Sequence, residues 1–191
     1  MSASLPKPGE PLEIRVKRPD SEDTLVEKTI FMGQFDTVKP PDSLRTTLGS
    51  CVGVLLVDSM GPLYGLAHIV LPKADVTPEQ KSSPDFELGK YADLAIPGLL
   101  KKMGARTAND YRRIQAKIMG GASLMQMPNG QMATSVQIGL QNIEAVRAIL
   151  KSFEIKIVAE DLGGKKGRQV QVEGLTGKVW VGIIGSPKKE L

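Results

Sequence analysis

The sequence lacks several features that would point to a particular class of protein. It has one cysteine in 191 residues, so no disulfide can form within the chain and nothing in it requires an oxidising compartment. Aromatic residues make up 4% of the chain, too few for a surface on which nucleic-acid bases stack. One cysteine and one histidine supply too few ligands for a zinc site. We therefore expect neither a bound metal nor a nucleic-acid partner.

Long apolar runs and a secretory signal are missing as well. The longest strongly apolar run, residues 52–57, is far shorter than a membrane span and suits a buried strand. The N-terminal residues, MSASLPKPGEPLEIRVK, do not have the basic and then apolar order of a secretory signal. These absences predict a cytoplasmic protein without membrane insertion.

The charge is positive overall, with a formal net charge of +4 and a pI near 9.1. Acidic and basic residues are interspersed, and the basic clusters are short: Lys165, Lys166 and Arg168 form one, Lys188 and Lys189 the other. We interpret such clusters as solvated surface. The functional alternative is a basic rim that faces an acidic protein partner.

The amino-acid composition changes once along the chain, at about residue 29. Residues 1–28 are polar and contain prolines at positions 6, 8, 11 and 19, so they can bury little apolar surface. We expect a flexible N-terminal arm there. Residues 29–191 show no second linker and no internal repeat, and they predict a single domain.

Strand and helix patterns alternate irregularly through that domain. Apolar residues at helical spacing predict a helix over 88–103, kinked or restarted at Pro97, and a second helix capped by Asn142 with its apolar stripe over 143–153. Strands are predicted at residues 51–58, 63–71, 114–119, 155–159, 169–172 and 178–184. The fold class is mixed α/β, of the α+β kind, with β-hairpins packed against at least two helices.

The cysteine and the histidine fall on the first predicted hairpin. With a tight turn at residues 60 and 61, Gly53 lies opposite His68. Cys51 is two residues from Gly53 and therefore shares its face of the sheet. Cys51 and His68 are then diagonal neighbours, roughly 7–8 Å apart at the backbone. A one-residue bulge would reverse this arrangement.

Nucleophilic catalysis needs such a pair. A neighbouring imidazolium stabilises a thiolate, and an imidazole can later protonate a leaving amine. Thr46 or Thr47 could orient the imidazole through its other ring nitrogen, and backbone N–H groups of Gly49, Ser50 and Cys51 could hold an oxyanion.

A structural interpretation of the same residues is also open. A lone cysteine in an apolar segment is often a small buried side chain, and a lone histidine on a strand is often a hydrogen-bonded structural residue. The glycine-rich stretches GGKKGR and GLTGK lack the full P-loop spacing and are interpreted as hairpin turns. From the residues alone, catalysis and packing remain equal alternatives.

A resemblance favours catalysis. LGSCVGVLLVD followed by LAHIVLP resembles the CheD family of chemoreceptor glutamine deamidases. The similarity continues in order through KYADLAIPGLLKKM, AKIMGGASLM, IGLQNIEAVRAIL, VAEDLGGKKGRQV and TGKVWV, over about residues 30–184.

The resemblance implies a cysteine-dependent enzyme that converts glutamines on chemoreceptor cytoplasmic helices to glutamates, with no cofactor. It implies a layered sandwich of mixed β-sheets and helices, similar to the catalytic fold of the cytotoxic necrotizing factor toxins. It assigns Cys51 as nucleophile and His68 as acid and base. The family threonine lies five or six residues before the cysteine, which favours Thr46 and leaves Thr47 as the alternative.

The same resemblance implies a candidate protein partner and an alternative function. Some relatives bind CheC, a phosphatase of the chemotaxis response regulator, which can occupy the deamidase site like a false substrate. The alternative to an enzyme is a non-catalytic adaptor that binds chemoreceptors or CheC and keeps Cys51 as part of its core.

Overall fold

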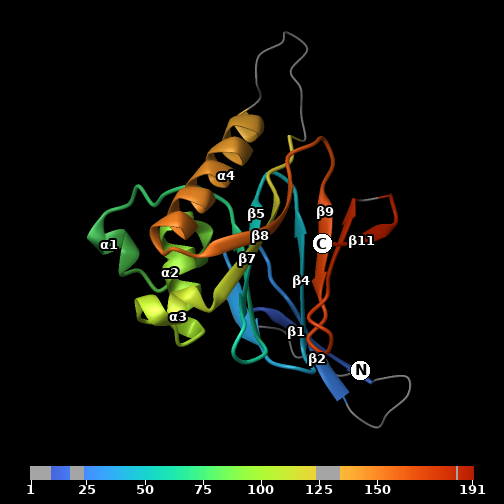
Figure 1. Cartoon of the computed structure of the whole chain (residues 1–191). Helices are drawn as coiled ribbons and strands as arrows, with labels where there is room; N and C mark the ends of the chain where they lie inside the picture. Colours follow the sequence, from blue (N-terminus) through green and yellow to red (C-terminus); the bar gives the residue numbers. More distant parts are fainter. Residues whose placement is uncertain (1–9, 18–23, 124–133, 184) are drawn as a thin grey trace.

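Two stacked β-sheets with helices over one of them make up the fold (Figure 1). The structure, a computed structural model, describes residues 10–17, 24–123, 134–183 and 185–191. Its strands are β1 (Leu12–Lys17), β2 (Thr24–Thr29), β3 (Phe35–Val38), β4 (Ser43–Leu48), β5 (Val52–Asp58), β6 (Leu63–Ile69), β7 (Ile114–Gly120), β8 (Lys156–Leu162), β9 (Arg168–Val172), β10 (Val179–Ile183) and β11 (Lys188–Glu190). Its helices are α1 (Pro78–Lys81), the 3₁₀ turn η1 (Leu88–Lys90), α2 (Ala92–Lys102), α3 (Ala108–Arg112) and α4 (Thr134–Ser152).

Both sheets are mixed. The six-stranded sheet has the order β1-β2-β4-β9-β10-β11, and within it only β2 and β4 run parallel. The five-stranded sheet has the order β3-β6-β5-β7-β8, and within it only β7 and β8 run parallel. The predicted α+β class, with sheets and helices in layers, is confirmed.

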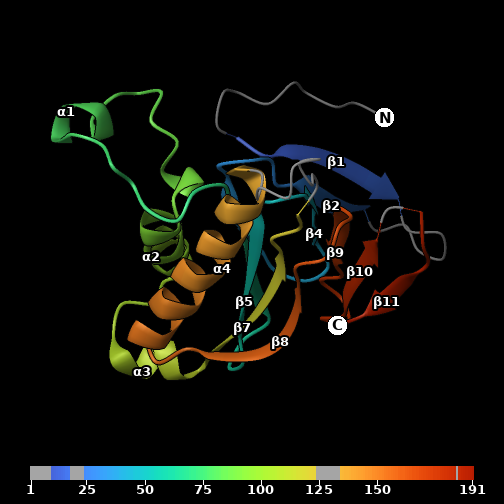
Figure 2. The same ribbon diagram turned by 90° about the horizontal axis from the view of Figure 1, so that it is seen from above.

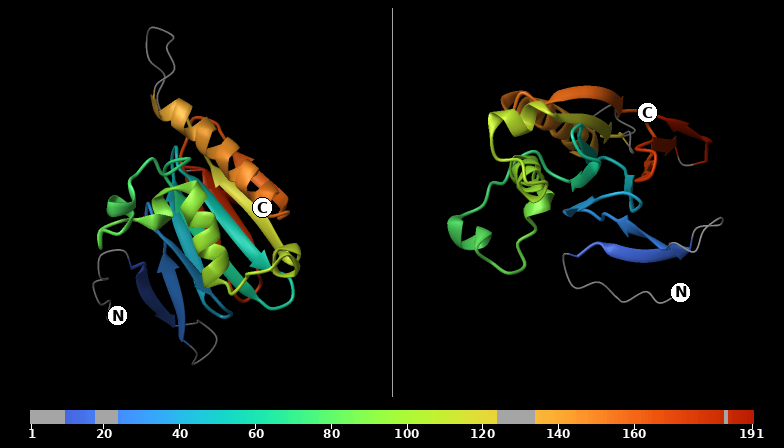
Figure 3. Two further views of the ribbon diagram at one scale, coloured as in Figure 1. Left: turned by 90° about the vertical axis from the view of Figure 1, so that its left-hand side faces the viewer. Right: turned by 60° about the horizontal axis from the view of Figure 1, so that its bottom comes forward.

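The five-stranded sheet lies in the middle, because its central strands are apolar on both faces. Along β5, Val54 and Leu56 face the helices while Leu55 faces the other sheet. Helices α2 and α4 cover the outer face, as Figures 2 and 3 show from two directions. No helix in the described ranges is long and apolar enough to cross a membrane.

The two long helices differ in detail from the sequence prediction. Pro97 lies inside α2, which begins at Ala92 after a separate 3₁₀ turn, so the restart falls before the proline. The prediction that Asn142 caps a helix is wrong, because α4 begins at Thr134. Asn142 is fully buried in the middle of α4, and its side-chain N–H donates to the carbonyl of Val70 at 2.9 Å. A remote carbonyl thus accepts the side-chain N–H of a residue that the pattern assigned to a helix end, while Asn142 Oδ1 has no hydrogen-bond partner among the described residues.

The segment expected to be a flexible arm contains two strands. β1 and β2 form a hairpin, and β2 pairs in parallel with β4. The N–H of Val26 donates to the Asp42 carboxylate at 2.8 Å, and Lys28 forms an ion pair with Asp36 at 2.8 Å. The strict alternation of apolar and charged residues in Leu12–Lys17 is a strand signal, which an interpretation from composition alone misses. Residues 1–9 and 18–23 of the expected arm lie outside the described residues.

The later strands follow the prediction closely. The predicted strands at 114–119, 155–159, 169–172 and 178–184 correspond to β7, β8, β9 and β10, and residue 184 lies outside the described residues. GLTGK joins the antiparallel pair β9 and β10, as expected of a hairpin turn. The same expectation is wrong for GGKKGR, because it leads from β8 in the five-stranded sheet to β9 in the six-stranded sheet, and these two strands do not pair. Arg168 does not lie on the surface as its basic cluster suggested, since it is buried and pairs with Asp161 at 2.5 Å.

Stepwise truncation tests how much the N-terminal strands contribute. A chain that begins at Thr24 should keep its melting temperature within a few degrees, because β1 is the one strand of the described residues that it loses and lies at the exposed edge of its sheet. A chain that begins at Ile30 should melt roughly 10 °C lower, because β4 then loses its parallel partner. Thermal unfolding followed by circular dichroism measures both. Equal melting temperatures would instead support a dispensable arm over residues 1–28.

Candidate active site

Cys51 lies where the chain leaves one sheet and enters the other. β4 of the six-stranded sheet ends at Leu48, and β5 of the five-stranded sheet begins at Val52. The three residues between them cross the interface between the sheets. This connection places the thiol beside groups from both sheets, and only 8% of the surface of Cys51 is exposed.

The β5–β6 hairpin has the predicted register. Gly53 lies opposite His68, and the paired strands end at Asp58 and Leu63. Cys51 therefore precedes Gly53 by two residues on the face that looks toward the six-stranded sheet, where Leu55 and Leu66 pack. The structure brings the only cysteine and the only histidine to the same face, as the sequence indicated.

Thr46 reaches His68 from the opposite sheet. Its Oγ1 lies 2.8 Å from His68 Nδ1 and donates its hydrogen to the carbonyl of Ile30 at 2.7 Å. Thr47, the next residue of β4, is exposed on the outer face of the sheet. The expectation that only one of the two threonines can face the imidazole is confirmed, and that residue is Thr46.

This contact determines the protonation of the ring. A hydroxyl has one hydrogen, and Thr46 gives its hydrogen to Ile30. His68 Nδ1 must therefore carry a hydrogen and donate it to Thr46 Oγ1. In a neutral ring the lone pair is then on Nε2, which is buried and has no hydrogen-bond partner among the described residues. That nitrogen is free to accept a proton.

The backbone of His68 is held as firmly as its ring. Its N–H donates to the carbonyl of Gln34 at 2.9 Å, and its carbonyl accepts from the N–H of Gly33 at 3.0 Å. Because Ile30 accepts from Thr46, the segment from Ile30 to Gln34 is bonded to both members of the threonine–histidine contact. Sequence reasoning missed this role, which leaves no signal in residue type because only main-chain atoms take part.

The end of β7 holds the cysteine connection from the other side. The N–H of Gly121 donates to the carbonyl of Cys51, and that of Ala122 donates to the carbonyl of Gly49, both at 2.8 Å. Gly120 has a φ of +105°, and a Cβ there would lie 2.3 Å from the Cys51 carbonyl oxygen. Glycine at position 120 is thus required for the close approach of the two backbones at the cysteine.

Burial keeps both reactive groups neutral. Burial lowers the pKa of His68 to about 4, and the nearby Ile30 backbone carbonyl opposes part of this shift. Burial also raises the pKa of the Cys51 thiol. The resting pair at neutral pH is a thiol and an uncharged imidazole, and not the thiolate and imidazolium that the sequence suggested. Within the described residues no three side chains of His, Cys, Asp or Glu are grouped to hold a metal ion.

Comparison with known proteins gives one family. The family model described as "CheD chemotactic sensory transduction" matches residues 70–182. A protein from Clostridium botulinum (strain Eklund 17B / Type B), named "Probable chemoreceptor glutamine deamidase CheD", is 40% identical over 83% of this chain and 94% of its own. Proteins named "Chemoreceptor glutamine deamidase CheD" from Halalkalibacterium halodurans and Thermotoga maritima are 36% and 37% identical, over 85% and 84% of this chain and 96% and 94% of their own.

The depressed pKa of His68 predicts a pH-dependent loss of stability. The folded ring has a pKa of about 4, below the 6.5 of an ordinary histidine. Between about pH 6.5 and pH 4, His68 is therefore protonated in the unfolded chain and neutral in the folded chain. Stability should fall by about 2 kcal/mol from this group between pH 7 and pH 5. Urea unfolding at both pH values measures it, with His68→Gln as the variant that lacks the titration. An equal loss in both proteins would contradict the shift.

A second prediction concerns the contact between Gly120 and Cys51. Gly120→Ala should cost about 3 kcal/mol or more and slow alkylation of Cys51 by iodoacetamide, because the methyl group displaces the cysteine carbonyl. Gly104→Ala is the matched control, since Gly104 also has a positive φ of +83° but has no atom within 4 Å of a Cβ. It should cost only about 1 kcal/mol of backbone strain. If both variants behaved alike, the close approach would have no effect.

Proposed function

The chain belongs to the CheD family, and from this premise we propose that it hydrolyses the side-chain amide of selected glutamines on the cytoplasmic helices of chemoreceptors. Glutamate and ammonia are the products, and the reaction serves chemotaxis adaptation. The names of its relatives support the substrate. One observation in this chain carries the proposed chemistry: Thr46 fixes the His68 ring with an unpartnered Nε2 on the face that Cys51 shares.

In the first proposed half-reaction, His68 acts as a general base. Its Nε2 takes the proton of the Cys51 thiol as the sulfur attacks the carboxamide carbon. The oxygen of the tetrahedral intermediate takes up negative charge, for which backbone N–H groups at Gly49, Ser50 and Cys51 are the proposed donors. A general base suits two groups that are both neutral at rest.

Collapse of the intermediate releases ammonia. His68 returns the proton from Nε2 to the departing nitrogen, and a thioester remains between Cys51 and the former glutamine side chain. In the second half-reaction His68 deprotonates a water molecule, which attacks the thioester carbon and displaces the sulfur. His68 returns that proton from Nε2 to the sulfur, and the receptor side chain is released as a carboxylic acid, which loses its proton to solvent. The cycle needs no cofactor.

Thr46 acts through His68. By accepting from Nδ1, its hydroxyl keeps the lone pair on Nε2, where the thiol proton must go. When Nε2 becomes protonated, the ring carries a charge in a buried site, and the Thr46 hydroxyl oxygen and the Ile30 carbonyl supply the polar groups that face it. Thr46 is therefore a positioning residue.

We extend the proposal to the protein's partners, its location in the cell and the relatives of its fold. The family resemblance supports a CheC-type phosphatase as a second partner that occupies the same site. A substrate on receptor cytoplasmic helices supports a cytoplasmic location. The layered arrangement of two sheets and helices supports a likeness to the catalytic fold of the cytotoxic necrotizing factor toxins.

The adaptor function remains the alternative, and the burial of Cys51 favours it, since a thiol with a raised pKa also suits a packing role. A purified cytoplasmic fragment of a chemoreceptor separates the two. After incubation with the protein, peptide mass spectrometry should show glutamine converted to glutamate, with matching ammonia release. Cys51→Ala and His68→Gln should abolish the conversion. Unchanged peptides with tight binding of the fragment would support the adaptor.

The two threonines provide an internal control for the mechanism. Thr46→Val keeps the shape of the side chain and removes the hydroxyl, and it should lower kcat by about 10²-fold through misorientation of the imidazole. Thr47→Val makes the same chemical change on the exposed face of the same strand and should change kcat little. Ammonia release under substrate saturation measures both. Equal rates for the two variants would remove Thr46 from the mechanism.

A further inference from the structure

Two large apolar side chains are presented to solvent next to the histidine. Phe31 and Met32 are 47% and 63% exposed, although Ile30 before them is fully buried. They lie in a tight turn in which the N–H of Gln34 donates to the carbonyl of Phe31 at 3.1 Å and the Gln34 side chain accepts from the N–H of Phe31 at 3.0 Å. Because Phe31 and Met32 are adjacent, they expose one contiguous apolar patch, which is a feature of docking surfaces, whereas single exposed apolar side chains are common.

This turn is anchored to the site on both sides of its tip. Ile30 accepts from Thr46, while Gly33 donates to the carbonyl of His68. The apolar tip is therefore fixed relative to the imidazole through main-chain bonds. A surface that binds a partner loses less entropy on binding when it is already held in this way.

The turn is a ridge between two hollows. One hollow of about 270 Å³ lies on the outer face of the six-stranded sheet and is lined partly by Phe31. The other, of about 480 Å³, lies between Gly33–Phe35 and residues 84–89. The two walls of the second hollow touch where Gly33 meets Gly89, since a Cβ on Gly89 would lie 2.2 Å from the Gly33 carbonyl oxygen. The ridge and this hollow therefore form one continuous surface.

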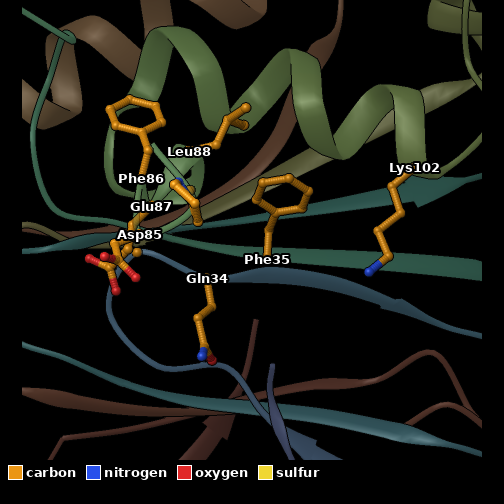
Figure 4. Close-up of a pocket in the computed structure, with 10 residues that line it drawn as sticks. Gln34, Phe35, Asp85, Phe86, Glu87, Leu88 and Lys102 are labelled. Atoms are coloured by element: carbon orange, nitrogen blue, oxygen red, sulfur yellow. The ribbon is translucent and has the colours of Figure 1, made fainter. Parts of the chain in front are cut away.

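The larger hollow combines apolar and acidic side chains (Figure 4). Phe35, Phe86 and Leu88 supply the apolar part, and Leu88 is 41% exposed. Asp85 and Glu87 point to the same end of the hollow, where neither has an ion-pair partner in the part of the chain that the structure describes. Lys102 lies on the far side and pairs with Asp36.

We propose that Phe31 and Met32 are docking residues for the receptor helix, whose apolar face packs on this ridge while a lysine or arginine of the same helix faces Asp85 and Glu87. The inference rests on the proposed function for its partner. An amphipathic helix presents apolar residues on one face and charged residues beside it, which matches an apolar ridge with an acidic hollow alongside. Docking on the ridge holds the helix beside the segment that bonds to Thr46 and to the backbone of His68.

The affinity experiment uses Cys51→Ala so that binding is measured without turnover. The double variant Phe31→Ser/Met32→Ser in this background should bind a fluorescently labelled cytoplasmic receptor fragment at least 10-fold more weakly, as expected when aromatic and methionine contacts are removed from an interface. Met60→Ser/Leu175→Ser is the matched control. It also removes two exposed apolar side chains, 81% and 52% exposed, from turns remote from the site. Its affinity should not change.

The kinetic experiment uses the intact cysteine. Phe31→Ser/Met32→Ser should raise KM for the fragment with kcat retained, and iodoacetamide should alkylate Cys51 at the wild-type rate. Unchanged KM and affinity would overturn the docking role. A parallel fall in kcat and alkylation would also overturn it, because the ridge would then act by holding His68. If the wild type fails to deamidate the fragment while binding still depends on the ridge, the proposed function fails and the docking surface stands.

The charged end is tested separately. Asp85→Asn/Glu87→Gln should weaken binding about 3- to 10-fold at low ionic strength and much less at high salt, because exposed charges are screened. Glu79→Gln and Glu154→Gln are control substitutions of exposed carboxylates outside the hollow. The same weakening by the controls would mean that net charge, and not this hollow, attracts the receptor.

Discussion

The main-chain bonds that hold residues 49–51 between two sheets are the constraint on which the site depends. Gly121 and Ala122, which directly follow β7, donate to the carbonyls of Cys51 and Gly49, and the strands on either side of residues 49–51 lie in different sheets. Backbone geometry therefore positions Cys51 at the interface between the sheets. The same arrangement lets Thr46, before the connection, face a histidine that pairs with the strand after it.

Because Thr46 and His68 are both buried, the hydrogen bond between them has a stronger effect on the imidazole than it would have in water. The imidazole is nearly fully buried, so an uncompensated charge on it is costly, and its pKa falls to about 4. The neutral ring is then a weak base. The burial that lowers its pKa also lowers the stability of the fold at low pH, because the unfolded chain takes up a proton there more readily than the folded chain.

Much of this site could be predicted from the sequence because it depends on local geometry. Counting across the turn after β5 placed Gly53 opposite His68, and the alternation of side chains in a strand separated Thr46 from Thr47. The parts that could not be predicted depend on distant partners. Asparagine is common at helix caps, but Asn142 donates to the carbonyl of Val70. Arginine is usually exposed, but Arg168 is buried and pairs with Asp161. Neither partner has a fixed spacing in the sequence, so no periodicity identifies it.

The strand that carries Thr46 has a consequence for synthesis on the ribosome. β4 lies between β2, which precedes it, and β9, whose Val170 pairs with Thr46 itself. β5 likewise pairs with β7, which is made later, and Gly121, directly after β7, donates to the carbonyl of Cys51. Such distant pairings form slowly and only after most of the chain has emerged. A nascent chain that already displays Cys51 and His68 therefore has no assembled site, and the thiol gains its partners only when the C-terminal strands dock.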